Sequence, residues 1–106
     1  MNNEDLAKRK EEWIKKIKKE GKLKNPTEDH KLGLKALQHK TRRDILDFIG
    51  YDVKKEDEIR KEFELDDLQL KIHLPMLEQA LFVEKEGDFY RLTPRGLSYM
   101  ENVEWR

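Results

Sequence analysis

The sequence contains no cysteine, and this absence excludes several classes of protein at once. Without thiols there is no disulfide framework, no thiolate metal site and no cysteine nucleophile. Long apolar runs are also missing, since the longest uninterrupted one extends only from Ala80 to Val83. We therefore expect no bilayer-spanning helix, and the first residues lack the apolar region of a signal peptide. These absences predict a cytoplasmic protein with no membrane partner.

The chain also lacks a net charge, because 23 basic residues balance 23 acidic residues. The two signs are unevenly distributed along the sequence. Residues 1–24 hold nine Lys or Arg against five Asp or Glu, and residues 31–50 hold five against two. Residues 51–68 reverse the balance, with four basic against eight acidic side chains. The total charge therefore does not indicate a polyanion partner, and its distribution matters more than its sum.

Motifs for catalysis and metal binding are missing as well. The three histidines, His30, His39 and His73, are widely separated and have no cysteine partners, so we expect them to pack or to face solvent. No glycine-rich phosphate loop, nucleophile elbow or HExxH motif occurs. The many carboxylates alternate with lysines, as is typical of solvated helix faces. We expect no enzymatic activity, no cofactor and no bound metal.

What the chain does contain is a series of amphipathic segments within the length of one domain. Residues 4–20 predict a helix with a narrow apolar stripe, and residues 22–29 predict a linker. The other expected helices cover residues 29–39, 41–50, 54–64, 66–80 and 94–105, and the expected strands cover residues 82–85 and 89–93. Residues 1–28 are therefore interpreted as an N-terminal helix and linker, and residues 29–106 as the main domain with a C-terminal helix.

The expected helix over residues 66–80 carries the clearest local signals. Asp66 and Gln69 have the spacing of a capping box, which satisfies free N–H groups at a helix start. Leu70, Leu74, Leu77 and Leu81, at steps of four, three and four residues, predict one buried side. Pro75 lies inside the helix and predicts a kink, because proline lacks an N–H and crowds the preceding turn.

Two segments of the sequence resemble one family. The opening helices of ArsR-like winged-helix regulators commonly read Ala-Leu-x-His-Pro-Thr-Arg-x-x-Ile-Leu, and residues 36–49 resemble them with ALQHKTRRDILDFI, although Lys40 replaces the usual proline. The recognition helix and wing of this family, and of related archaeal regulators, are similar to residues 70–96, LKIHLPMLEQALFVEKEGDFYRLTPRG. The resemblance spans roughly residues 32–98. It implies a mainly α protein with a small β-hairpin, a winged helix-turn-helix with extra N- and C-terminal helices.

The resemblance further implies a transcriptional regulator that binds double-stranded DNA in a sequence-specific manner. Residues 54–64 would be the positioning helix, and residues 66–80 the recognition helix in the major groove. The outward side chains expected to contact DNA are Gln69, Lys71, Ile72, His73 and Met76. Gln is suited to an adenine edge, and Lys to guanine or phosphate. An ordinary solvated helix face is the alternative interpretation.

Four arginines are candidate phosphate contacts. Arg42 and Arg43 begin the helix expected at residues 41–50, whereas Arg91 and Arg95 lie on and just after the second strand. Guanidinium groups bind phosphate oxygens in a bidentate fashion, which suits them to this role. A salt bridge to a neighbouring carboxylate, or plain solvation, is an equally good interpretation of these positions.

Acidic residues argue against DNA binding at two places. Asp66 and Asp67 open the expected recognition helix, where they would repel phosphate, and the hairpin turn is Glu86-Gly87-Asp88. Either Asp66 is simply the helix cap and DNA contacts come from elsewhere, or this face binds a protein. The alternative function is therefore a winged-helix protein–protein interaction module without direct DNA binding.

The terminal helices carry more apolar side chains than a small core needs. We expect a homodimer formed through these helices, because regulators of this type commonly dimerise to place two recognition helices about one DNA turn apart. The residues assigned to this interface are Trp13, Ile14, Ile17, Tyr99, Val103 and Trp105. The alternative is that the two helices pack on each other within one subunit.

Overall fold

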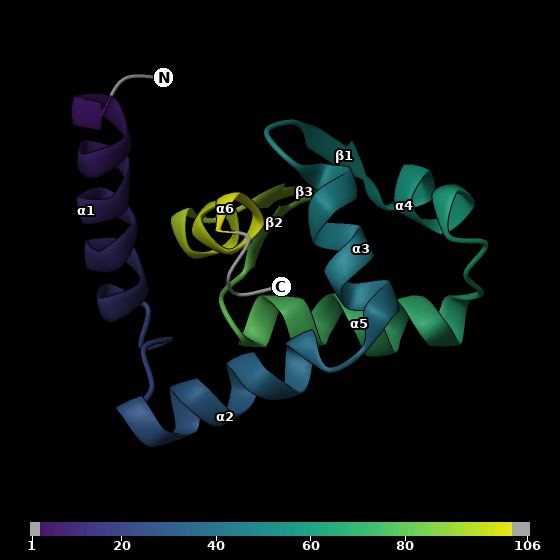
Figure 1. Ribbon diagram of the computed structural model, residues 1–106, viewed down its shortest axis with the longest axis horizontal. Helices are drawn as coiled ribbons and strands as arrows, with labels where there is room; N and C mark the ends of the chain where they lie inside the picture. Colours follow the sequence, from purple (N-terminus) through teal and green to yellow (C-terminus); the bar gives the residue numbers. More distant parts are fainter. Residues whose placement is uncertain (1–2, 103–106) are drawn as a thin grey trace.

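The structure is a computed structural model that describes residues 3–102 (Figure 1). It is mainly helical, with a small antiparallel sheet. In chain order the elements are α1 (Asn3–Lys19), α2 (Pro26–Leu37), α3 (Lys40–Ile49), β1 (Val53–Lys55), α4 (Glu56–Glu62), α5 (Asp67–Gln79), β2 (Val83–Glu86), β3 (Phe89–Leu92) and α6 (Pro94–Glu101). The part of the last expected helix beyond residue 102 lies outside the described range.

The sheet has the strand order β1-β3-β2, and both strand pairs are antiparallel. β2 and β3 form a hairpin in which Val83 pairs with Leu92 and Glu86 with Phe89. Gly87 turns the chain with a φ of 63°, a left-handed value that glycine adopts without steric cost. The expected hairpin is confirmed, with each strand end within one residue of its predicted position.

The strand β1 differs from the expectation of a helix over residues 54–64. The chain remains extended from Val53 to Lys55, along the free edge of β3, and the helix begins only at Glu56. Both Val53 and Lys55 face solvent, and Lys54 between them is half-buried. Such a segment lacks the apolar alternation that indicates a strand, so only the pairing with β3 reveals it.

Two helices begin at positions other than those expected, each with a side-chain cap. Asn25 accepts the Glu28 N–H at 2.9 Å and Pro26 occupies the first turn, so α2 starts three residues early. The residues interpreted as a linker are therefore partly a helix start. α3 begins at Lys40 and is capped by His39, whose Nδ1 accepts the Thr41 N–H at 3.2 Å.

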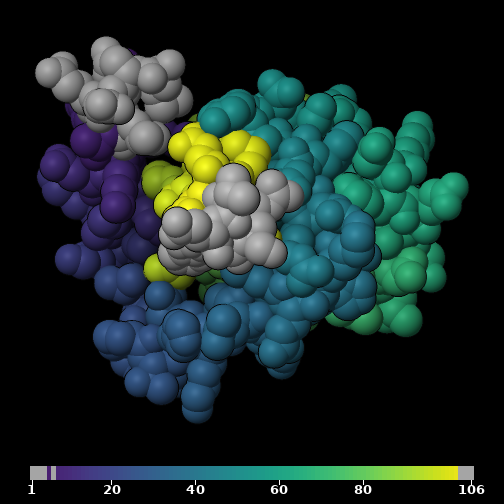
Figure 2. Space-filling model, viewed as in Figure 1, coloured from purple at the N-terminus to yellow at the C-terminus, as the bar shows by residue number. Residues whose placement is uncertain are grey.

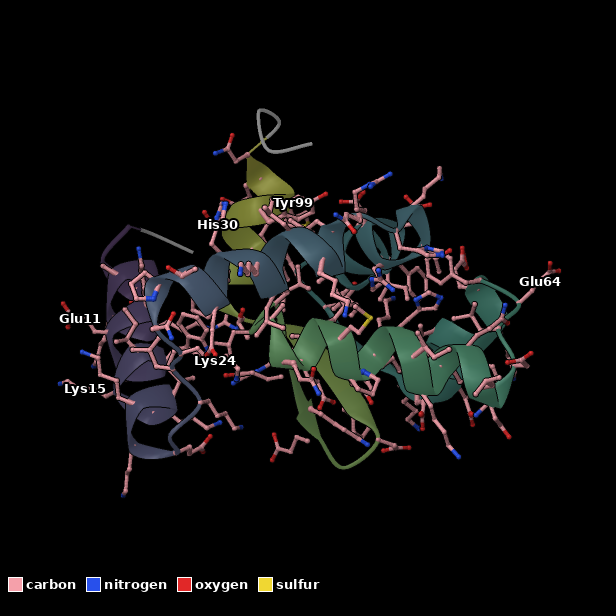
Figure 3. The ribbon with its side chains drawn as sticks, turned by 90° about the horizontal axis from the view of Figure 1, so that it is seen from below. Glu11, Lys15, Lys24, His30, Glu64 and Tyr99 are labelled. Atoms are coloured by element: carbon pink, nitrogen blue, oxygen red, sulfur yellow. The ribbon has the colours of Figure 1, made fainter. Side chains whose placement is uncertain are left out.

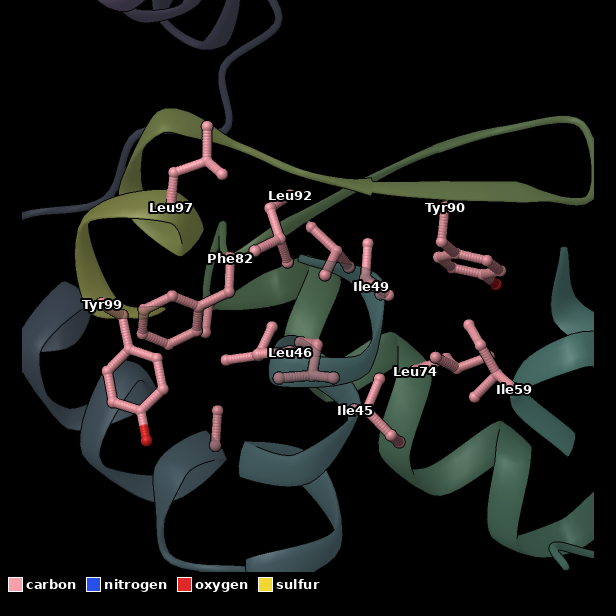
Figure 4. Packing of buried hydrophobic residues seen from close by; sticks show 14 of the residues in the cluster. Ile45, Leu46, Ile49, Ile59, Leu74, Phe82, Tyr90, Leu92, Leu97 and Tyr99 are labelled. Atoms are coloured by element: carbon pink, nitrogen blue, oxygen red, sulfur yellow. The ribbon is translucent and has the colours of Figure 1, made fainter. Parts of the chain in front are cut away.

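The hydrophobic core lies between helices α2–α6 and the hairpin (Figure 4). Ile45, Leu46 and Ile49 of α3 lie at its centre, and Phe82 and Tyr99 close one end. The buried residues of this core are Ala36, Ile45, Leu46, Ile49, Ile59, Leu70, Leu74, Leu77, Ala80, Phe82, Val83, Tyr90, Leu92, Leu97 and Tyr99. The predicted buried side of α5 is confirmed, since its leucines Leu70, Leu74 and Leu77 all belong to this set.

The start of α6 is joined closely to the segment that follows α5. The Thr93 hydroxyl donates to the Leu81 carbonyl at 2.6 Å and accepts the Gly96 N–H at 3.1 Å. The Thr93 N–H donates to the Phe82 carbonyl at 3.0 Å. A Cβ at position 96 would lie 2.2 Å from that carbonyl oxygen. Only glycine therefore fits where α6 crosses this segment.

α1 lies to one side of this body, next to α6 (Figures 1 and 2). A small cluster of Trp13, Ile17 and Leu81, separate from the main core, joins it to the rest of the chain. One turn before Trp13, Arg9 donates to the Leu92 carbonyl at 2.8 Å. α1 is thus attached along a narrow line of contact.

Candidate nucleic-acid interface

α5 packs against α2 and α3 with one side and exposes the other (Figures 1 and 3). The predicted capping box is confirmed. Asp66 Oδ1 accepts the Gln69 N–H at 2.8 Å, and Gln69 Oε1 accepts the Asp66 N–H at 2.9 Å. The helix continues as one element through Pro75, and the kink expected there stays a prediction.

The outward side of α5 is more apolar than a DNA-reading helix requires. Leu68 is 68% exposed, and Ile72, one turn later, is 47% exposed. Lys71 is exposed beside them, whereas Pro75 and Met76 are half-buried. Apart from Gln69, whose side chain is partly used by the cap, this face therefore combines one cation with a short apolar strip.

His73 and Arg42 meet inside the protein, so the expectation that they reach outward to DNA is wrong. Their exposed fractions are 6% and 7%. Arg42 donates to the carbonyls of Ala36 at 2.7 Å and Lys35 at 3.1 Å, where α2 ends. Its Nη1 also lies 3.1 Å from Nδ1 of His73. Arg42 thus satisfies carbonyl groups that the end of a helix leaves without intrahelical partners.

This contact requires His73 to be neutral. Arg42 can only donate, so Nδ1 of His73 must accept, and its proton lies on Nε2. Burial lowers the pKa of His73, and the nearby charges of His39 and Arg42 lower the pKa further. The ring of His39 is close, with its centroid 4.6 Å from that of His73. These three side chains form a polar joint, here called the Arg42–His73 joint, where α2, α3 and α5 meet.

Arg43 and Arg95 are also engaged within the chain. Nη1 of Arg43 donates to the Leu37 carbonyl at 2.7 Å, again at the end of α2. Arg95 forms a bidentate ion pair with Asp29, at 2.7 and 2.9 Å, and donates to the Ala80 carbonyl at 3.1 Å. The salt-bridge interpretation of Arg95 is confirmed. Arg95 could bind a phosphate through both terminal nitrogens only by giving up its ion pair with Asp29, whereas Arg43 uses only Nη1 in its bonds to carbonyl groups.

The hairpin carries charges of both signs on its outer face. Arg91 of β3 pairs with Glu84 of β2 at 2.9 Å, and its side chain remains about half exposed. Such surface pairs contribute about 0–1 kcal/mol, so Arg91 can exchange its partner at little cost. The turn residues Glu86 and Asp88 are exposed carboxylates. Of the four candidate arginines, Arg91 is the one most accessible to a phosphate.

Two residues assigned to a dimer interface on α1 are buried within one chain. Trp13 and Ile17 pack against Leu81, and Ile14 is partly buried against the same cluster. The Arg95 guanidinium carbon lies 5.9 Å from the centre of the Trp13 ring, within range of a cation–π contact. The expected dimer role of Trp13 and Ile17 is therefore wrong, because their apolar surface is used by the intrachain contact.

The α6 residue Tyr99, which was also assigned to the dimer interface, is buried within one chain as well. Tyr99 is 1% exposed and lies in the main core against Phe82, with ring centroids 6.0 Å apart. Burial raises the pKa of its phenol. An interface role for Tyr99 is therefore wrong. The other two assigned residues, Val103 and Trp105, lie outside the described range.

Leu81 is a key residue whose role sequence reasoning did not identify. Its φ is 64°, in the left-handed region. Its N–H donates to the Glu78 carbonyl and the Phe82 N–H to the Leu77 carbonyl, each at 3.0 Å, which is the Schellman pattern that usually takes glycine. The Leu81 side chain is instead the partner of Trp13. The leucine spacing places Leu81 on the same helix face as Leu70, but α5 ends at Gln79 and Leu81 lies in the separate cluster.

Membrane-spanning helices and metal sites are both absent from the described part of the chain. No helix within residues 3–102 is long and apolar enough to span a bilayer. Over the same residues, no three His, Cys, Asp or Glu side chains gather closely enough to hold a metal ion. The α5 surface and the grooves beside α1 are therefore the features with a possible binding role.

The sequence is similar to that of an archaeal protein. No protein-family model matches the sequence. The chain is 36% identical over 74 residues to an uncharacterized protein of Archaeoglobus fulgidus. The matched segment covers 70% of this chain and 85% of the archaeal protein, so most of that protein is represented here. The chain belongs to the same family as this archaeal protein.

Proposed function

We propose that this chain is an ArsR-like winged helix-turn-helix regulator that binds double-stranded DNA through α5. The order of elements supports this proposal, since helices α3, α4 and α5 are followed directly by the β2–β3 hairpin. β1 adds further support, because it lies between the first two of these helices and extends the hairpin to three strands. The resemblance of residues 36–49 and 70–96 points to the same fold.

The observation that carries the proposal is the two-sided environment of α5. Leu70, Leu74 and Leu77 anchor one side in the core, so the helix is held rigidly. The side that bears Leu68, Lys71 and Ile72 is exposed. A helix presented in this manner can enter the major groove, which is about 12 Å wide and admits an α-helix.

The contacts that we propose are fewer than the residue types alone suggest. Lys71 would bind guanine or phosphate, and Ile72 and Met76 would contact thymine methyl groups. Gln69 keeps its Oε1 in the capping box, but its amide N–H groups are available to an acceptor on a base. Arg91 would exchange its surface ion pair for a phosphate. The other arginines and His73 hold the helices in place.

We further propose that the protein acts as a homodimer, so that two α5 helices reach successive turns of the major groove. The interface must use surfaces other than the buried α1 stripe. Leu34 on α2 is one apolar candidate, since it is 52% exposed. Sedimentation equilibrium of the parent and of Leu34→Asp tests this idea, and a monomeric parent at high concentration would contradict it.

Fluorescence anisotropy of a labelled random-sequence duplex, titrated at two salt concentrations, tests the DNA proposal. Phosphate contacts release counterions, so binding should weaken as salt increases. Lys71→Glu should weaken binding by about tenfold, since one direct DNA contact is typically worth 1–3 kcal/mol. The matched control is Lys15→Glu, which makes the same charge change on the outer side of α1, away from the body (Figure 3).

Each outcome of this titration has a definite meaning. Salt-dependent binding that Lys71→Glu weakens and Lys15→Glu leaves unchanged supports α5 as the DNA-facing helix. Equal loss in both variants would place the contact on general positive charge and not on α5. No binding at low salt would contradict the proposal.

A second candidate function is a protein-interaction module, and the exposed apolar strip on α5 favours it. Leu68 and Ile72 lie one turn apart at the acidic end of the helix, near Glu64 and Asp67. An apolar strip bordered by carboxylates suits an amphipathic helix with basic flanks. Leu68→Ser separates the two functions, because it removes apolar surface that a protein interface needs and places no charge against DNA, so it should weaken a protein interface and leave non-specific DNA binding nearly unchanged.

A further inference from the structure

Arg9 of α1 lies beside the ion pair on the outer face of the hairpin. Glu84 of β2 and Arg91 of β3 are opposite each other in the strand register, and their side chains pair at 2.9 Å. The next residue on β3 is Leu92, whose carbonyl accepts a hydrogen bond from Nη2 of Arg9 at 2.8 Å. α1 therefore brings a second guanidinium group close to the carboxylate that Arg91 uses.

The charges of these three side chains act on one another. Arg9 is half-buried, and burial lowers its pKa. The charge of Arg91 lowers this pKa further, whereas the charge of Glu84 raises it. Arg9 is thus repelled by Arg91 and attracted by Glu84. While Arg91 holds the carboxylate, the two forces on Arg9 oppose each other.

Glu84 needs a cation more than Arg91 needs an anion. Only 20% of the Glu84 side chain is exposed, against 53% of the Arg91 side chain. A partly buried carboxylate that loses its partner costs free energy. A guanidinium group has five N–H donors, so Arg9 can keep its bond to Leu92 and also donate to Glu84.

Three other charged side chains line the surface around this pair, and each is exposed: Lys16, Lys85 and Glu86. Solvent and salt screen exposed charges more strongly than half-buried ones. Arg9 is therefore the cation best placed to neutralise Glu84 when Arg91 leaves it.

We propose that Arg9 and Arg91 share Glu84, so that α1 docks more tightly when Arg91 turns to a DNA phosphate. Arg9 is then a positioning residue, because it replaces the cation that Glu84 loses and does not itself touch DNA. The coupling is reciprocal, so the tighter docking of α1 raises the affinity for DNA by the same factor. The link to DNA rests on the proposed function, whereas the sharing of the carboxylate does not require DNA.

Hydrogen exchange of α1 tests the shared carboxylate in the absence of DNA. Arg91→Gln removes the competing cation from an exposed position, so the α1 amides should become about two- to fivefold more protected. In an Arg9→Gln background, the same substitution should have no effect on α1. The control is Lys15→Gln, which removes a charge from the outer side of α1 and should leave the response to Arg91→Gln intact (Figure 3).

Fluorescence anisotropy with a labelled duplex at several salt concentrations tests the link to DNA. Arg91→Gln should weaken binding and reduce the slope of log affinity against log salt by about 0.9, because one phosphate contact is lost. Arg9→Gln should weaken binding by about two- to fivefold and leave this slope unchanged. The duplex should also increase the protection of α1 in the parent chain and not in Arg9→Gln.

Two results would overturn the inference. One is an α1 whose protection is unchanged or reduced in Arg91→Gln. The other is a salt slope that falls as much in Arg9→Gln as in Arg91→Gln, because Arg9 would then contact phosphate directly. A parent chain that binds no DNA would instead contradict the proposed function and remove the link to DNA, and the exchange data distinguish this result from failure of the shared carboxylate. Far-UV circular dichroism confirms that each variant is folded.

Discussion

The body of the molecule and its first helix are held in very different ways. The body has one continuous core to which helices α2–α6 and the hairpin all contribute. α1 is attached mainly through Trp13, Ile17 and Leu81. Because hydrophobic stabilisation scales with buried apolar area, the body should unfold as one cooperative unit. We therefore expect α1 to be a satellite that detaches without unfolding the body.

The largest effect is expected where the body has no room to adjust. In Gly96→Ala the new Cβ would lie 2.2 Å from the Phe82 carbonyl oxygen, so the backbone must move and several core contacts are lost. We expect a loss of about 3 kcal/mol or more in the free energy of unfolding, measured by urea denaturation. Both α6 and the segment after α5 should be affected together.

Gly33→Ala is the matched control for this substitution. A Cβ at Gly33 would meet only Phe82 Cζ at 3.9 Å, an ordinary contact on α2. Alanine is favoured over glycine inside a helix, so this variant should gain about 0.5–1 kcal/mol. Opposite signs for the two changes support the view of a tightly packed body. A Gly96→Ala variant as stable as the parent would contradict it.

The next effect concerns the Arg42–His73 joint and depends on pH. The folded pKa of His73 is lowered, so the unfolded chain binds more protons than the folded chain as the pH falls through the ordinary histidine range. The stability of the body should therefore be full above about pH 6.5 and decrease below it. Urea denaturation of the parent between pH 5 and pH 7.5 measures this slope.

His73→Gln should reduce this pH dependence, because glutamine does not titrate and its oxygen can still accept from Arg42. His30→Gln is the control, since His30 is exposed on α2. The same slope in the parent and in His73→Gln would show that the joint does not cause the acid sensitivity.

α5 illustrates how much could be predicted from the sequence. The capping box of Asp66 and Gln69 and the buried leucines depend on local spacing alone, and both were predicted correctly. His73 was placed on the outer side because its environment depends on Arg42, 31 residues earlier in the chain. A contact between distant residues leaves no local pattern, so the sequence alone could not reveal this joint.

The same limit applies to α1 and to β1. The apolar stripe with Trp13 was recognised, but whether it meets a second subunit or the same chain depends on Leu81, far away in sequence. β1 exists because Val53 and its neighbours lie along the edge of β3, and not because of their own pattern. Sequence reasoning thus identified amphipathic elements well, and the partners of their faces poorly.

A smaller effect on the body is expected when α1 is released. Trp13→Ala removes the largest side chain of the satellite cluster. In a continuous core a Trp→Ala change costs about 3–5 kcal/mol, but here the loss cannot exceed the docking free energy of α1. Hydrogen exchange followed by mass spectrometry should show fast exchange in α1 and a body within about 1 kcal/mol of the parent. Global destabilisation by several kcal/mol would instead make α1 part of the cooperative core.

The smallest expected effect concerns Leu81, whose backbone follows α5 in the body and whose side chain anchors α1. Leu81→Ala and Leu81→Gly both remove the side chain that anchors α1, so hydrogen exchange should show α1 released in each. They differ in the backbone, because alanine retains the cost of a φ of 64° whereas glycine removes it. The body of Leu81→Gly should therefore be about 1 kcal/mol more stable than that of Leu81→Ala.

Two results would contradict this expectation. If the two bodies are equally stable, the left-handed leucine is not strained. If α1 remains protected in both variants, Trp13 and Ile17 hold the helix through contacts other than Leu81, and the narrow attachment inferred here is wrong.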